Sequence, residues 1–78
     1  MGPLVYYCRW RGAKVRLHGR DDAAVWGELV TQEEGRERVE TFHFDLRTWE
    51  LRLQAEGEAT VLQLDELGVV VSGPATSF

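Results

Sequence analysis

Apolar and polar residues alternate through most of this 78-residue chain, and that two-residue period is the feature that most constrains its fold. Side chains of a β-strand point alternately to the two faces of a sheet, so this pattern gives each strand one buried and one solvated face. Eight glycines, scattered singly, supply turn positions between the alternating segments. We therefore predict an all-β domain: a single small antiparallel sheet of six or seven short strands, curled into a barrel or half-barrel.

The first predicted hairpin joins residues 5–10 to residues 13–18 through a two-residue turn at Arg11-Gly12. The two strands then agree on which face is buried, because the same pairing separates apolar from basic side chains. The buried face would carry Tyr6, Cys8, Trp10, Val15 and Leu17, and the exposed face would carry Tyr7, Arg9, Lys14, Arg16 and His18.

The second predicted hairpin turns at residues 45–48, where the Asp45 side chain can accept hydrogen bonds from the turn backbone. Phe44 would then lie opposite Trp49, and on the other face His43 would lie opposite Glu50. The apolar pattern changes parity at residues 39–40, which predicts a bulge there. Gly57 and the pair Asp65-Glu66 mark the later turns. The predicted core consists of Tyr6, Val15, Leu17, Leu29, Phe42, Phe44, Trp49, Leu51, Leu53, Leu62, Leu64 and Val69.

Residues 22–33 fit two structures. As a strand, this segment would be apolar on both faces around Gly27. As a helix, it would be capped by Asp21 or Asp22 and ended by Gly35, giving an α+β fold. The glycine in its middle and its β-branched residues favour the strand. We expect residues 1–73 to form one domain and residues 74–78 to form an irregular tail after Pro74.

No arrangement of residues in the sequence predicts catalysis. Cys8 and His18 would point to opposite faces of the first hairpin, so they would not form a nucleophile and its base. The paired acids at 21–22 and 65–66 have no histidines at metal-ligand spacing, and the isolated glycines form no phosphate-binding loop. We expect no enzyme activity, no catalytic residue, no metal and no cofactor.

The charge distribution is uneven, since five of the nine basic residues and none of the thirteen acids lie in the first twenty positions. The first twenty residues thus carry +5, and the remainder, with thirteen acids and four basic residues, carries −9. An aromatic ring among cations is typical of single-strand nucleic-acid binders. A nucleic-acid site at Tyr7, Arg9, Lys14, Arg16 and His18 is therefore one hypothesis, opposed by the net charge of −4.

Self-association is the preferred hypothesis. A chain of this length buries only about 60% of its unfolded surface, and its single cysteine allows no internal disulfide. A second chain would supply the missing buried area, so we expect a protein-interaction module that forms a homo-oligomer, with another protein partner as an alternative. Trp26, Val30 and Val70 are the interface candidates. No stretch reaches the ~18 apolar residues of a membrane span, and the lone thiol favours the cytoplasm.

Overall fold

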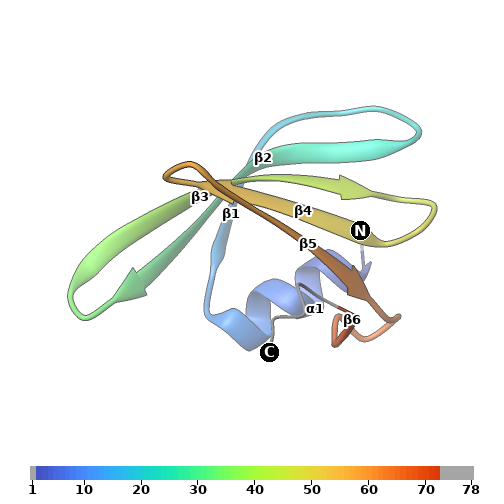
Figure 1. Cartoon of the computed structure of the whole chain (residues 1–78). Helices are drawn as coiled ribbons and strands as arrows, with labels where there is room; N and C mark the ends of the chain where they lie inside the picture. The colour runs from blue at the N-terminus through green and yellow to red at the C-terminus, as the bar shows by residue number, and fades with distance from the viewer. Residues whose placement is uncertain (1, 73–78) are drawn as a thin grey trace.

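The computed structural model describes residues 2–72 and consists of an N-terminal helix packed on one face of a six-stranded antiparallel sheet (Figure 1). Every strand pairs with the next one along the chain, so the sheet is a simple meander whose free edges are the first and last strands. The six strands confirm the predicted mostly β fold. The sheet does not close into a barrel and has the form of a half-barrel. The elements are α1 (Gly2–Arg11), β1 (Lys14–Arg20), β2 (Ala24–Glu33), β3 (Arg36–Asp45), β4 (Glu50–Ala55), β5 (Glu58–Leu64) and β6 (Val70–Ser72).

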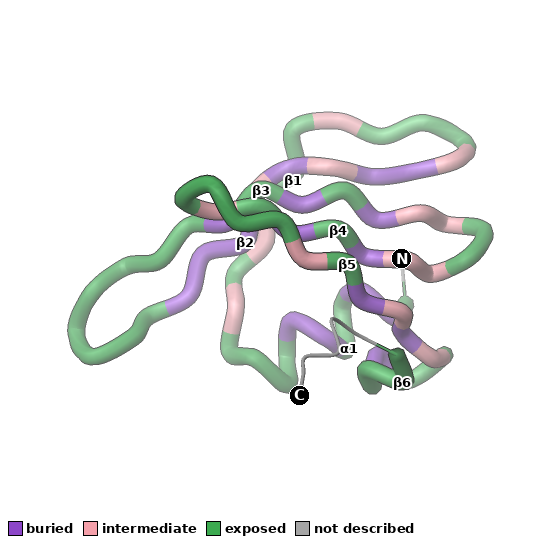
Figure 2. The backbone as a smooth tube through the Cα atoms, in the orientation of Figure 1, coloured by how far each residue is buried: buried purple, intermediate pink, exposed green. Residues whose placement is uncertain are grey.

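The core lies between α1 and the inner face of the sheet, as the run of buried residues along both shows (Figure 2). From the helix it receives Leu4, Tyr7 and Cys8, which recur at helical spacing on one side. From the sheet it receives every second residue of β2 to β5. Two predicted core residues, Val15 and Trp49, are half-buried and pack against the edge of the core. Seven others are confirmed as buried: Leu29, Phe42, Phe44, Leu51, Leu53, Leu62 and Leu64.

The predicted first hairpin is wrong, because residues 2–11 form a helix rather than a strand. Pro3 lies in the first helical turn, where a missing N–H costs nothing. Gly12, at φ 67°, ends the helix in the left-handed conformation. The Ala13 N–H then donates to the Cys8 carbonyl at 2.8 Å, closing the last turn. The helix turns Tyr6 outward and Tyr7 inward, which reverses both predictions for these tyrosines.

Two further core predictions are wrong for reasons of position. Leu17 lies on the edge strand β1 opposite Gly27, which offers no side chain to pack against, and a bulge follows it. Val69 lies in the turn before β6 rather than in a covered strand. Both residues are exposed.

The helical alternative for residues 22–33 is also wrong, because this segment forms β2. Gly27 is buried there between β1 and β3. A Cβ atom at this position would lie 2.0 Å from the Arg16 carbonyl oxygen. The glycine that counted against a helix is therefore the residue that lets two strands approach.

The second hairpin forms as predicted, but its register is shifted by two residues. Phe44 lies opposite Leu51, and His43 lies opposite Arg52 rather than Glu50. Trp49, with a φ of 63°, belongs to the loop and not to β4. Each residue of β3 therefore pairs with a β4 residue two positions later than predicted. Because the shift is even, each side chain keeps its predicted face. The turn role of Asp45 is confirmed, since its Oδ1 accepts the N–H groups of Arg47 and Thr48 at 2.7 and 3.0 Å.

No bulge interrupts β3 at residues 39–40, because β2 and β3 pair without a break from Ala24 and Asp45 to Glu33 and Arg36. The alternation of inner-face and outer-face residues continues along β3 because Glu40, a buried polar residue, occupies an inner-face position. Its carboxylate lies 3.8 Å from both the Arg11 and the Arg38 guanidinium groups. The outer half of this hairpin projects beyond the other strands and is mostly exposed (Figure 2). The predicted tail at residues 74–78 lies outside the described residues.

Candidate interaction surface

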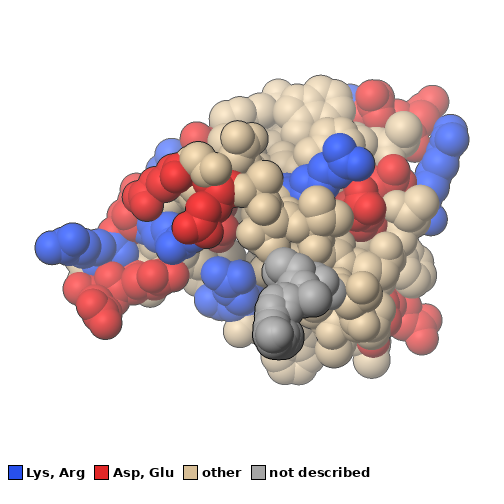
Figure 3. Space-filling view, in the orientation of Figure 1, with Lys and Arg blue, Asp and Glu red and all other residues tan. Residues whose placement is uncertain are grey.

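Five apolar residues form an exposed surface where α1 meets the turn between β5 and β6. Trp10 stands at its centre and is 71% exposed, and Leu67 beside it is 58% exposed. We call this surface the Trp10 patch, and it consists of Tyr6, Trp10, Leu67, Val69 and Val70. Figure 3 shows that acidic and basic side chains gather at the projecting end of the β2–β3 hairpin.

Hydrogen bonds hold the turn that supplies Leu67 and Val69 to this patch. Asp65 Oδ1 accepts the N–H groups of Leu67 and Val69 at 2.8 and 3.0 Å, and the Asp65 N–H donates to the Val69 carbonyl. The Trp10 indole N–H donates to the Leu67 carbonyl at 3.1 Å, which ties the turn to the helix. Gly68 makes the contact possible, since its φ is +77° and a Cβ at this position would lie 2.5 Å from the Tyr7 amide nitrogen of α1.

The Trp10 ring separates two shallow hollows of about 410 and 400 Å³. Besides Trp10, the first is lined by Tyr7, Arg11, Gly68, Val69 and Val70, and the second by Tyr6, Arg9 and Leu67. Most of the surface that lines each hollow is apolar, although each includes one arginine. Apolar side chains of a partner would fit into these two hollows.

Behind the patch, α1 buries two titratable side chains, Tyr7 and Cys8. The Arg11 guanidinium donates to the Tyr7 hydroxyl at 2.7 Å and also lies 5.7 Å from the centre of the Tyr7 ring. Burial raises the pKa of Tyr7, although the Arg11 cation opposes the shift. Burial also raises the pKa of the Cys8 thiol to about 11. At neutral pH both groups are protonated, and Cys8 is a small buried core residue, as predicted.

The structure divides the five residues of the predicted nucleic-acid site between two elements. Tyr7 is buried, and Arg9 lies on the exposed side of α1. Lys14, Arg16 and His18 remain together on the exposed side of β1. Two of these side chains approach one acid, because Glu28 lies 3.8 Å from Arg16 and 3.5 Å from His18.

An aromatic pair lies on the same side of the sheet as these β1 cations, on the face that α1 does not cover. The Trp26 and His43 rings stack with an interplanar angle of 10° and centroids 6.4 Å apart. Gly19 makes room for the indole, since a Cβ there would lie 2.7 Å from the Trp26 ring. Within residues 2–72, this outer face brings aromatic rings to the same side of the sheet as basic residues of β1.

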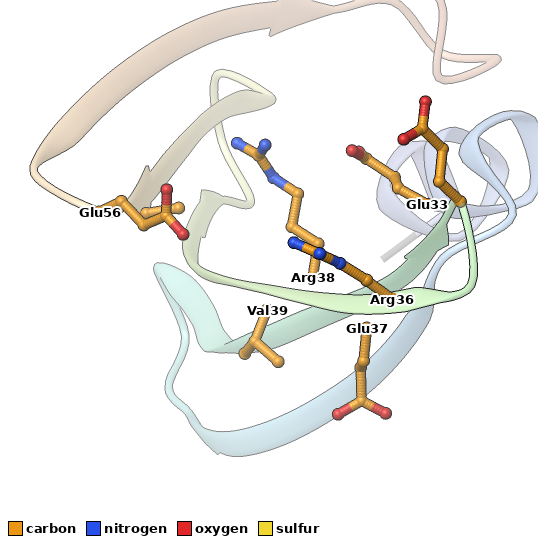
Figure 4. Close-up of a pocket in the computed structure, with 8 residues that line it drawn as sticks. Glu33, Arg36, Glu37, Arg38, Val39 and Glu56 are labelled. Atoms are coloured by element: carbon orange, nitrogen blue, oxygen red, sulfur yellow. The ribbon is translucent and has the colours of Figure 1, made fainter.

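A third hollow of about 600 Å³ lies between the projecting β2–β3 hairpin and the turn after β4. Arg38 extends into it, whereas Glu37 and Val39 point to the other side of the strand (Figure 4). Its lining mixes four glutamates with two arginines, most of them exposed. This mixture favours no ligand of one charge, so the hollow is a weaker candidate than the Trp10 patch.

Of the three predicted interface residues, only Val70 belongs to the patch. Val30 is buried, and Trp26 is half-buried in its stack on the outer face. Four residues of the patch were not predicted as interface residues: Tyr6, Trp10, Leu67 and Val69. The predicted first hairpin placed Tyr6 and Trp10 inside, and Val69 was predicted as a core residue. Pro3 followed nine residues later by Gly12 is the helix signal that would have turned Tyr6 and Trp10 outward.

Within residues 2–72, no three His, Cys, Asp or Glu side chains come together in a way that would hold a metal ion. No helix in the same range is long and apolar enough to cross a membrane. Comparison of the chain with known proteins found no matching family model and no significantly similar curated protein or solved structure.

Proposed function

We propose that this chain is a small, non-enzymatic assembly module of the cytoplasm that binds a second copy of itself through the Trp10 patch. The observation that carries the proposal is the exposure of five contiguous apolar residues around a tryptophan. Tryptophan and tyrosine are enriched among the residues that dominate binding energy at protein interfaces.

The size of the patch fits a reversible dimer. From their exposed fractions, the five residues present roughly 500 Å² of surface, which lies within the ~300–600 Å² of patches that are often functional. Two copies would bury about 1,000 Å², the lower limit for a specific interface. We therefore expect a dissociation constant in the micromolar range.

Leu67→Asp is expected to raise the dissociation constant of the dimer at least about 100-fold. The substitution removes a buried leucine from each of two symmetric contacts, about 1.5 kcal/mol per copy, and also places a charge in each. Sedimentation velocity across a dilution series measures the change.

The matched control is Val61→Asp, because Val61 is 47% exposed on the outer face, away from the patch. This variant should dimerise like the native chain. If both substitutions weaken dimerisation equally, or if neither weakens it, the Trp10 patch is not the dimer contact.

A nucleic-acid binder is the second candidate, favoured by the Trp26–His43 stack on the same face as the β1 cations. Bases would stack on that face while Lys14 and Arg16 contact phosphates. A fluorescence titration with a single-stranded oligonucleotide at low salt should then lose about 10-fold in affinity or more on Arg16→Glu. Arg36→Glu, at the tip of the β2–β3 hairpin, is the control with the same change of charge. Absence of binding at low salt, or equal losses in the two variants, removes this candidate.

A further inference from the structure

The two elements that build the Trp10 patch carry charges of opposite sign. The helix α1 contributes two cations, Arg9 and Arg11, and no acid. The turn between β5 and β6 contributes two acids, Asp65 and Glu66, and no cation. The Trp10 indole donates a hydrogen bond to this turn, so its ring lies at the boundary between the cationic and the acidic element.

On each element, one of the two charged side chains forms hydrogen bonds within the chain. Arg11 donates to the Tyr7 hydroxyl at 2.7 Å, and Asp65 accepts two N–H groups of its own turn. Arg9 and Glu66 are exposed, and neither forms an ion pair with another side chain among the described residues. These two side chains are therefore the charges that a partner on the patch would meet.

We propose that Arg9 of each copy pairs with Glu66 of the other copy when two chains meet on the Trp10 patch. The inference rests on the proposed self-association and adds its orientation. A two-fold axis that runs along the boundary between α1 and the turn places the cationic element of one copy on the acidic turn of the other. An axis across that boundary would instead place each charge on its own copy, and like charges in contact oppose association.

The same orientation covers the exposed leucine of the turn. Leu67 follows Glu66 in the sequence and is 58% exposed. With the turn of one copy over α1 of the other, Leu67 would contact the exposed rings of Tyr6 and Trp10. Arg9 lines the hollow beside these rings, within reach of an acid next to the leucine. Apolar burial would then supply most of the affinity, and the ion pairs at the rim would set the orientation.

An exchange of charges tests the pairing. Either Arg9→Glu or Glu66→Arg alone places like charges at both symmetric contacts, so each variant should dimerise about 10-fold more weakly than the native chain. Mixed in equal amounts, the two variants should recover the native dissociation constant, because each contact between unlike chains again joins a cation to an acid. Sedimentation velocity across a dilution series measures the three samples. Both positions are exposed, so each variant should keep the native circular dichroism spectrum.

Two comparisons separate this contact from an effect of net charge. Glu66→Arg adds two positive charges to a chain of net charge −4, which would strengthen association if overall repulsion controlled it. Arg52→Glu makes the same change of charge as Arg9→Glu, but on the outer face, where Arg52 is exposed. This control should dimerise like the native chain.

The outcomes distinguish the pairing from the self-association on which it rests. Weakening of both variants alone, with recovery in the mixture, supports both claims. If the native chain dimerises but the mixture stays as weak as its components, or Arg52→Glu weakens the dimer as much as Arg9→Glu, the pairing is wrong and the self-association stands. The pairing is equally wrong if neither variant weakens the dimer. If the native chain stays monomeric, both claims are wrong.

Discussion

Gly68→Ala is expected to lower the free energy of unfolding by about 2–4 kcal/mol, a large part of the roughly 3–5 kcal/mol that a core of this size supplies. Two costs add at this position. The residue has a φ of +77°, which an alanine adopts only under strain. In addition, its Cβ would lie 2.5 Å from the Tyr7 amide nitrogen and 2.6 Å from the Pro3 carbonyl oxygen. Both are backbone atoms of α1, which cannot rotate away.

Gly35→Ala is the matched control for this prediction. Gly35 has nearly the same φ, +78°, but its Cβ would meet no atom within 4 Å. This variant should lose only about 1 kcal/mol, the cost of the backbone conformation alone. Urea unfolding of both variants measures the difference. Equal losses would mean that the turn before β6 does not rest on the helix as described.

Phe44→Ala is expected to cost about 3–5 kcal/mol, enough to leave much of the chain unfolded at 25 °C. Phe44 is fully buried among the side chains that α1 and the sheet share, and among residues 2–72 it is the largest residue with no exposed surface. Removing its ring leaves a cavity that a two-layer structure cannot close without moving the helix.

Val61→Ala, on the uncovered outer face of β5, should change the free energy of unfolding by less than about 0.5 kcal/mol. Circular dichroism and urea unfolding of the two variants make the comparison. A Phe44→Ala chain as stable as Val61→Ala would place the core somewhere other than between α1 and the sheet.

The sheet from β2 onward could be predicted from the sequence because its alternation is strong. Phe42, Phe44, Leu51 and Leu53 take the same face in any register that differs by an even number of residues, so the faces were predicted even though the partners were not. The exact register depended on Trp49, whose left-handed backbone conformation is not expected for a bulky residue.

The N-terminal element could not be predicted from the same pattern. In residues 2–11 the positions Leu4, Tyr7 and Cys8 fit a helix, but the alternation of Tyr6, Cys8 and Trp10 fits a strand equally well. A segment of ten residues is too short for periodicity alone to decide, and packing against the sheet determines the outcome.

The candidate site was predicted only in part for the same reason. Reading residues 5–10 as a strand put Trp10 inside and Tyr7 outside, the reverse of their positions in the structure. The patch also depends on Gly68, which brings Leu67 and Val69 against a helix about sixty residues earlier in the chain. No local pattern in the sequence encodes that contact.

The most direct test of self-association is the solution mass of the native chain. Sedimentation equilibrium between about 1 and 100 µM should show the mass rising from 8.9 kDa toward twice that value as the protein is concentrated, in the range expected for an interface of this area. A folded chain that remains at 8.9 kDa up to 100 µM would contradict the account.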